Sequence, residues 1–424
     1  MKLGDAGELM KRSFALLSAI GMGAFAPRAL AQVTVSSERH SSGVGAEYVH
    51  DLKGNRSQNS IIFFQQRHDW SLNLLQRDVQ VHCDYKMWID GDRPETLTGV
   101  DFDNFEKLNL YADWIWKDIR FRVGNQEITW GESPMISILD VVNPRNLAHP
   151  RGFYDPAAKI PQFTVNMEYQ KEKASYQVLL TPWPAPMRQP KEVLDFKVAP
   201  SKPYRPILDG EYGFRFGYLE GDIDTKFYFL HHWPRVPSYV FRPWSADYDV
   251  EVKDIKQETI GTSASYAGTN WIMRGDLAYH NNYPAINISN EIERAGLAQG
   301  IFGASWTTDQ LDTFGTELHF DLWEKGPSAY SDSAFIKDKR GLQDIYWLGF
   351  NSSFNIKNQL LEPQVQYLKG INKSDEALRL IVIWNATDHL EVVGEYQKTE
   401  GDSGSPKLLL NRRDTLGLRL TWSF

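Results

Sequence analysis

The chain has 424 residues, a formal net charge of −8 and a single cysteine, Cys83. The acidic balance argues against nucleic acid as a partner, because domains that bind nucleic acid are basic. One cysteine allows no internal disulfide, no haem-attachment motif and no cysteine-based zinc cage, so we expect neither a cofactor nor a bound metal.

The first 31 residues have the features of a secretory signal peptide. Lys11 and Arg12 precede the uncharged apolar run SFALLSAIGMGAFA, and ALAQ then places small residues before Gln32. This order of a basic, an apolar and a small-residue region predicts export with cleavage near Ala31. We therefore interpret residues 1–31 as a signal peptide and residues 32–424 as one mature domain, since no linker-like segment divides the remainder.

After this segment, apolar and polar residues alternate along most of the chain. In DVQVHCDYKMWID every second residue from Val79 to Met87 is apolar, and LNLYADWIWK, QFTVNMEYQ, EYGFRFGYLE, WIMRGDLAYH and TELHFDLW follow the same rule. Such segments form strands with one apolar and one polar face. The mean hydropathy is −0.44, and no later apolar run approaches the ~20 residues of a membrane helix. A membrane strand needs only about 9–11 alternating residues, so the pattern predicts a transmembrane β-barrel.

Short turns and long loops are expected to alternate between these strands. The short turns are predicted at 70–71, 117–118, 171–173, 220–222, 267–270, 307–310, 355–358 and 385–388. The longer segments, rich in Pro, Asp and aromatic residues, are 131–161, 183–208, 232–254 and 325–340. Eight turns and two terminal strands predict an all-β, antiparallel barrel of about 18 strands, within a range of 16–18. Its short turns and both termini would lie in the periplasm and its long loops outside the cell.

The longest early loop, 131–161, is predicted to fold into the lumen. Its apolar run, 135–139, would be costly to leave in water, so we expect it to pack on the barrel wall with its polar residues opposite Arg120 and Arg122. The residues expected to line the resulting constriction are Arg120, Arg122, Gln126, Glu132, Asp140, Asn143, Arg145, Arg151, Asp155 and Glu168. In the alternative interpretation, Glu132 and Asp140 pair with Arg120, Arg122 or Arg145 only to pin the loop.

The same region carries a family resemblance. RVGNQEITWGES and LDVVNPRNL resemble the R-x-G-x-Q-x-x-x-W-G-E and D-x-x-N-P signature of a poorly characterised group of proteobacterial outer-membrane barrels, whose genes are often found beside exporters of the RND superfamily. The resemblance maps the signature onto Arg122, Gly124, Gln126, Trp130, Gly131, Glu132, Asp140, Asn143 and Pro144. It implies a porin-like pore and names no solute, and an association with an exporter would add a periplasmic partner.

The chain ends on the alternating segment TLGLRLTWSF. Its apolar residues, Leu416, Leu418, Leu420, Trp422 and Phe424, are expected to face lipid when the last strand closes the barrel. The ending also resembles the signal, here Trp422 and Phe424, by which the barrel assembly machinery recognises its substrates. These features predict a protein of the outer membrane of a Gram-negative bacterium.

Three functions fit a barrel of this width. With 16–18 strands the lumen can hold an aqueous channel, so the first expectation is a porin for passive or moderately selective passage of small solutes. The second is a component of a larger complex, either exporter-associated or a sleeve for a redox cytochrome. The third is a structural or adhesive barrel with a plugged lumen. We expect no enzymatic activity, because no local motif supports nucleophilic, phosphate or metal chemistry.

Overall fold

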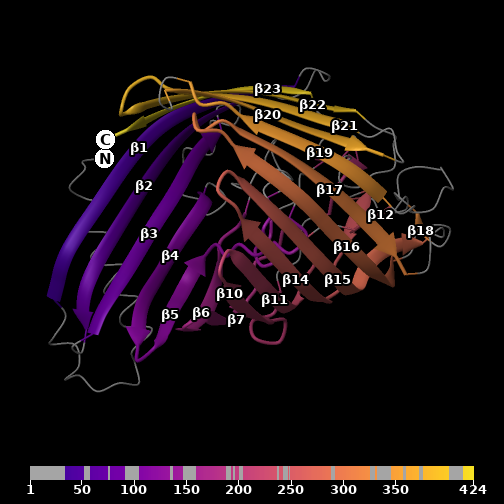
Figure 1. Cartoon of the computed structure of the whole chain (residues 1–424), viewed down its shortest axis with the longest axis horizontal. Helices are drawn as coiled ribbons and strands as arrows, with labels where there is room; N and C mark the ends of the chain where they lie inside the picture. The colour runs from indigo at the N-terminus through magenta and orange to yellow at the C-terminus, as the bar shows by residue number, and fades with distance from the viewer. Residues whose placement is uncertain are drawn as a thin grey trace.

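The structure, a computed structural model, shows an antiparallel sheet that closes on itself (Figure 1). It describes residues 34–51, 58–74, 77–90, 105–133, 137–146, 159–187, 192–193, 196–199, 204–235, 238–241, 247, 249–287, 292–324, 330–331, 345–356, 360–371, 376–400 and 414–424. Within these ranges no helix has the length and apolarity of a membrane span.

Eighteen strands form the barrel. They are β1 (Thr34–Asp51), β2 (Gln58–Leu74), β3 (Arg77–Asp90), β4 (Phe105–Trp116), β5 (Ile119–Gln126), β6 (Gln162–Lys171), β7 (Ala174–Trp183), β10 (Glu211–Glu220), β11 (Ile223–His232), β14 (Gln257–Ala267), β15 (Trp271–Asn287), β16 (Ile292–Thr307), β17 (Thr313–Trp323), β19 (Ile345–Ser353), β20 (Leu361–Gly370), β21 (Glu376–Asn385), β22 (Leu390–Glu400) and β23 (Thr415–Ser423). Five short strands accompany them: β8 (Glu192–Val193), β9 (Phe196–Lys197), β12 (Ser238–Phe241), β13 (Val250–Lys253) and β18 (Tyr330–Ser331).

The first and last barrel strands pair and close the ring. Gly43 of β1 lies opposite Ser423 of β23, and Asp51 lies opposite Thr415. Closure pairs Gly43–Asp51 of β1 with Thr415–Ser423 of β23, the two strands that would otherwise be the edges of the sheet, and a closed sheet is what hydrocarbon surroundings require. The predicted fold, an antiparallel barrel of about 18 strands, is confirmed.

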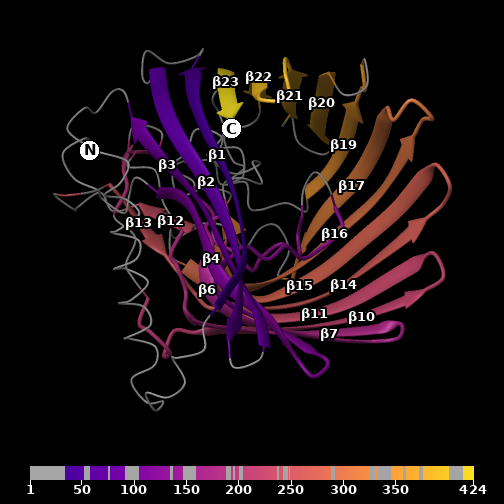
Figure 2. The same ribbon diagram turned by 90° about the vertical axis from the view of Figure 1, so that its left-hand side faces the viewer.

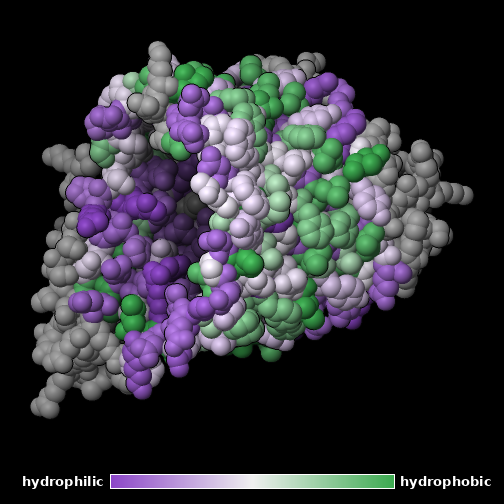
Figure 3. Space-filling view, viewed as in Figure 1, coloured by the Kyte–Doolittle hydropathy of each residue, from purple (hydrophilic) through white to green (hydrophobic). Residues whose placement is uncertain are grey.

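The two faces of the sheet differ as the alternation predicts. On β10, Tyr212, Phe214 and Tyr218 are exposed on the outer face, whereas Glu211 and Gly213 are buried on the inner face. Figure 3 shows hydrophobic residues spread over the outer wall and a hollow bordered by hydrophilic residues. Lipid can cover the first surface, and water or polar side chains can fill the second.

Seven of the eight predicted short turns fall between consecutive strands. Lys117 and Glu172 occupy two of these turns with positive φ of 55° and 50°, the left-handed conformation found in tight turns. The turn predicted at 70–71 is wrong, because Trp70 and Ser71 continue the pairing of β2 with β1 and β3 as far as Leu74. Figure 2 shows the short turns at one end of the barrel and the β12–β13 hairpin at the other.

The segment between β5 and β6, residues 127–161 and here called the inner loop, folds into the barrel. Its described parts are 127–133, 137–146 and 159–161. Their buried apolar side chains are Ile128, Trp130, Ile138, Leu139 and Val142, and they pack on Leu179, Tyr228, Leu230, Ala278 and Ile301 from β7, β11, β15 and β16. The predicted packing of this loop on the wall is confirmed for its described residues, and burial of Ile138 and Leu139 from the apolar run contributes to the driving force.

Candidate functional site

Two glycines of the signature give the inner loop its path. Gly124 has φ +136°, and a Cβ atom there would lie 2.2 Å from the Leu110 carbonyl oxygen of β4. Gly131 has φ +88°, and a Cβ atom there would lie 2.6 Å from the Ser137 Oγ. Neither position tolerates a side chain, so Gly124 lets β5 approach β4 closely and Gly131 lets the chain turn after Trp130.

Glycines of the barrel wall make room for Trp130 and Leu139, two buried side chains of the inner loop. The Trp130 indole nitrogen donates a hydrogen bond to the Gln177 Oε1 at 2.9 Å. A Cβ atom on Gly213 would lie 2.9 Å from the Trp130 ring, and one on Gly261 would lie 2.2 Å from the Leu139 Cδ2. The absence of side chains at Gly213 and Gly261 therefore makes room for Trp130 and Leu139, and the loop is fitted to this part of the wall.

Asn143 joins the two ends of the inner loop. Its Oδ1 accepts a hydrogen bond from the Ile128 backbone nitrogen at 2.7 Å, and its Nδ2 donates to the carbonyl oxygens of Gln126 (3.1 Å) and Ile160 (3.0 Å). The Gln126 amide donates to the Thr164 carbonyl oxygen at 2.7 Å. Asn143 and Gln126 were expected to line the lumen, but both are buried. They satisfy the backbone groups that an irregular loop cannot pair with one another.

A buried ion pair pins the middle of the inner loop. Arg235 donates hydrogen bonds to the Val141 carbonyl oxygen at 3.0 Å, to the Val142 carbonyl oxygen at 2.6 Å and to Glu211 at 2.8 Å. Gln162 also donates to the Val142 carbonyl oxygen and to Glu211. The sequence interpretation missed Arg235 and Glu211. Arg235 lies in the segment after β11, which was interpreted only as an outer loop, and Glu211 lies on β10. The pairing of charged residues from segments far apart in the sequence leaves no local signal.

Asp140 and its partners close the base of the inner loop. The Lys159 Nζ lies 2.6 Å from the Asp140 Oδ2, and an Arg145 Nη2 lies 3.7 Å from it. Arg145 and Lys159 also form an antiparallel backbone bridge, and the Ile160 nitrogen donates to the Pro144 carbonyl oxygen at 2.7 Å. Arg145 was one of the predicted partners of Asp140, whereas Lys159 was not. Asp140 is buried within this base and does not line the open lumen.

The tip of the inner loop is held by β11, β15 and β17. Lys226 of β11 forms an ion pair with Glu132. The backbone nitrogens of Glu132 and Ser133 donate to Asp276 of β15 at 3.1 and 3.3 Å, and the Ser133 hydroxyl donates to Glu317 of β17 at 2.9 Å. The prediction that Glu132 pairs with Arg120, Arg122 or Arg145 is wrong. The loop runs along the inner wall as far as β17 and carries Glu132 away from those arginines.

Arg120 and Arg122 instead share one carboxylate of the neighbouring strand. The Arg120 Nε donates to the Asp113 Oδ1 at 2.9 Å, and the Arg122 Nε donates to the Asp113 Oδ2 at 3.4 Å. The Arg122 guanidinium also lies 5.1 Å from the centre of the Tyr111 ring, a cation–π distance. Glu168 of β6 pairs in register with Arg120. Arg120 remains 46 % exposed, so a positive charge lines this side of the lumen.

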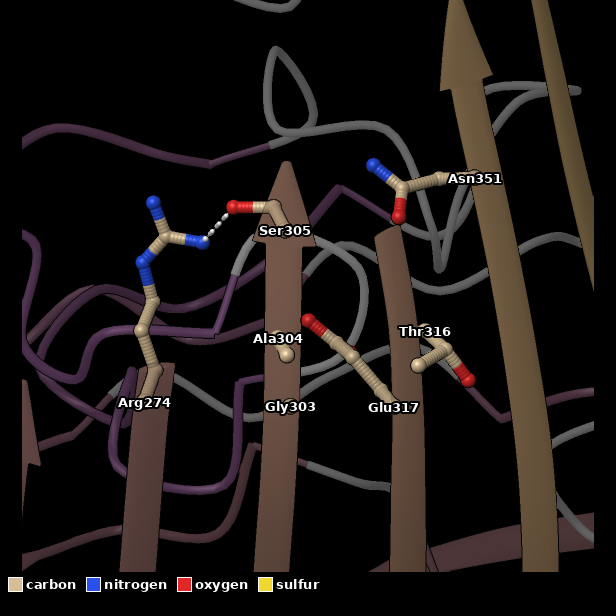
Figure 4. A pocket seen from close by; sticks show the side chains of 7 residues that line it. All are labelled: Arg274, Gly303, Ala304, Ser305, Thr316, Glu317 and Asn351. Carbon is tan, nitrogen blue, oxygen red and sulfur yellow. Dashed lines mark hydrogen bonds between the residues drawn. The ribbon is translucent and has the colours of Figure 1, made fainter. Parts of the chain in front are cut away.

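A hollow in the lumen wall lies beside the loop tip (Figure 4). It is bordered by Arg274 of β15, Ser305 of β16, Glu317 of β17 and Asn351 of β19. An Arg274 Nη1 donates to the Ser305 Oγ at 3.1 Å, and Figure 4 shows the Glu317 carboxylate on the neighbouring strand. The wall therefore presents both signs of charge within a few strands. Among the described residues no three His, Cys, Asp or Glu side chains are arranged to hold a metal ion.

Four further predicted residues lie away from this centre or outside the described ranges. Arg151 and Asp155 fall outside the residues that the structure describes. Trp422 and Phe424 are exposed on the outside of the barrel. The Phe424 nitrogen donates to the Ser42 carbonyl oxygen at 2.9 Å, which fastens the end of the chain to β1.

Comparisons with known proteins show the fold. No family model matches the chain, and no curated protein matches its sequence. The outer membrane protein OpdK of Pseudomonas aeruginosa has a TM-score of 0.55 at 10% identity, over 92% of this chain and 100% of that one. OccK3 (OpdO) of the same organism scores 0.54 at 12% identity, over 92% and 96%. Acinetobacter baumannii OccAB3 scores 0.54 at 12% identity, over 92% and 99%.

Proposed function

We propose that this chain is a porin-like channel of the outer membrane of a Gram-negative bacterium. The inner loop forms the constriction of the pore through which small solutes pass. The closed barrel has an apolar outer face, and its fold is similar to that of an outer membrane protein. Its eighteen strands are enough to enclose an aqueous lumen. Passage would be passive, with selectivity from the fixed charges of the lumen.

One observation carries the proposal: the inner loop is pinned along one part of the wall. The described residues of the inner loop contact β6, β7, β10, β11 and β14–β17. They also contact the segment that follows β11. A loop held in this way narrows the lumen from one side. The hollow bordered by hydrophilic residues in Figure 3 agrees with such an opening.

The charges that remain exposed beside the loop suggest moderate selectivity. Arg120 and Arg122 lie on β5 with side chains 46 % and 23 % exposed, and the half-buried Arg274 lies on β15, close to the buried Glu317 of β17. Fixed charges of both signs at a narrow passage favour solutes by charge distribution as well as by size. A role as an exporter-associated barrel or as a sleeve for a redox cytochrome would need a periplasmic partner. A plugged structural barrel would need contacts to the loop from the whole wall.

Ion conduction in a planar bilayer tests the proposal. We expect the purified mature protein to give stable channels, and we expect a variant in which a short Gly-Ser linker replaces 131–158 to give a larger conductance. Replacing 402–412, between β22 and β23, with the same linker is the control and should leave the conductance unchanged. A barrel without current would contradict the channel, and an equal conductance after loop replacement would contradict the constriction.

A further inference from the structure

A continuous row of buried polar side chains crosses five strands on the inner face of the barrel. The row, here called the polar row, consists of His232 on β11, Thr259 on β14, His280 on β15, Gln299 on β16 and Asp321 on β17, each at most 8 % exposed. It lies toward the ends of these strands that carry the long loops. No step of the proposed channel uses it.

Each member of the polar row is hydrogen-bonded to the next. The His232 Nε2 lies 2.8 Å from the Thr259 Oγ1, which lies 2.7 Å from the His280 Nδ1. The His280 Nε2 lies 2.8 Å from the Gln299 Oε1, and the Gln299 Nε2 donates to the Asp321 Oδ1. At the other end, the His232 Nδ1 donates to the carbonyl oxygen of the next residue at 2.6 Å. The row therefore contains five hydrogen bonds.

Five hydrogen bonds need five protons, and the neutral side chains supply only four. Both ends of the row, the Trp233 carbonyl and the Asp321 carboxylate, can only accept. Each neutral histidine supplies one proton, and so does the threonine hydroxyl. Gln299 supplies one, because its nitrogen faces one neighbour and its oxygen faces the other. With neutral histidines, one contact would bring two lone pairs together in a buried site, which is unfavourable.

We propose that the polar row is a proton-binding site that holds one excess proton, carried as the His280 imidazolium and balanced by the Asp321 carboxylate. An imidazolium donates from both ring nitrogens, so it supplies the fifth proton. His280 is the better place for it, because only Gln299 separates it from Asp321. On the other side, the Arg235 guanidinium acts on His232 and repels a second positive charge.

The other titratable groups around the polar row leave this count unchanged. His319 on β17 lies 2.8 Å from the same Asp321 oxygen and can donate to it as a neutral ring. Glu211 on β10 is paired with Arg235, and the Tyr283 ring centre on β15 lies 6.0 Å from the His280 ring centre. His231 and Glu258 lie on the opposite face of the sheet, 3.7 Å apart. None of them supplies a proton between His232 and Asp321.

The polar row is connected by hydrogen bonds to the Arg235–Glu211 ion pair that holds the inner loop. His232 donates to the Trp233 carbonyl oxygen, and the Trp233 nitrogen donates to Glu211 at 2.9 Å. Glu211 in turn holds Arg235, which binds the carbonyl oxygens of Val141 and Val142. Loss of the excess proton removes one hydrogen bond from the row and weakens this connection. The consequence for the pore rests on the proposed channel function, whereas the proton site itself does not.

Nuclear magnetic resonance of protein labelled with ¹⁵N-histidine tests the site, because ¹⁵N shifts separate imidazolium from neutral imidazole. We expect one of the ten histidines to remain an imidazolium at pH 8.5, where an exposed histidine is only about 1% protonated. In Asp321→Asn the asparagine amide supplies the fifth proton, so the imidazolium signal should disappear. His389→Asn, in the turn before β22, is the control and should keep it.

Two results would overturn the proposal. One is that every histidine of the unmodified protein is neutral at pH 8.5, a result that needs no variant. The other is an imidazolium signal that survives in folded Asp321→Asn. The link to the pore is measured separately, as open-channel current noise across the pH range in which the imidazolium titrates. The noise should rise with pH in the unmodified protein and stay flat in Asp321→Asn, and equal profiles would disprove the link.

Discussion

The buried pair of Arg235 and Glu211 should hold the inner loop in place, and Arg235→Met tests this. The substitution keeps the length of the side chain but leaves the Glu211 carboxylate, 3 % exposed, without its cation. It also removes the hydrogen bonds to the carbonyl oxygens of Val141 and Val142. Removing one partner of a buried pair costs roughly 3–5 kcal/mol. That range corresponds to a change of roughly 100-fold or more in the ratio of pinned to released loops.

Two assays read the release of the loop directly. Limited proteolysis of the folded barrel should cut the inner loop much faster in Arg235→Met, and open-channel noise should increase, because a released loop moves within the lumen. The double variant Glu211→Gln/Arg235→Met removes the unpaired buried charge and should recover part of the loss. Arg205→Met is the matched control, because Arg205 forms an exposed pair with Asp209 and exposed pairs contribute little. If Arg235→Met showed the same rate of proteolysis and the same open-channel noise as the unmodified protein, the ion pair would not hold the loop in place.

Three further predictions concern packing, selectivity and assembly. Gly261→Val should displace Leu139 and lower the free energy of unfolding by about 1–3 kcal/mol, measured by denaturant titration, whereas Gly394→Ala should have little effect because nothing lies within 4 Å of its added Cβ. Arg122→Glu should shift ion selectivity toward cations, read as the reversal potential in a salt gradient, and an unchanged potential would place Arg122 away from the conducting path. Deletion of Phe424 should lower the amount of heat-modifiable, membrane-inserted barrel, and an undiminished amount would contradict its role in assembly.

The alternation of apolar and polar residues predicted most of the fold because it reports local geometry. Successive side chains of a strand point to opposite faces, so Leu416, Leu418 and Leu420 could be assigned to the outer face from sequence alone. The turn predicted at 70–71 was wrong, because Trp70 continues β2. An aromatic residue near a polar one resembles a strand end, and only the pairing with neighbouring strands shows that the strand continues.

The inner loop shows where prediction from sequence stopped. Its apolar run predicted burial against the wall, and the signature singled out Trp130, Asn143 and Glu132, all of which bind other parts of the structure. Their partners were not predicted. The residues that bind the tip and the middle of the inner loop, such as Asp276 and Arg235, lie on distant segments and belong to no local motif.

The sequence by itself determined the strand pattern, the approximate strand number and the inward course of the loop, because each depends on the periodicity or apolarity of a short segment. Only the tertiary structure decided which charges meet inside the barrel. Glu132 pairs with Lys226, 94 residues along the chain, rather than with Arg122 nearby. Closure of the ring and the path of the loop bring these two side chains together, and electrostatic attraction depends on that distance in space and not on separation along the chain.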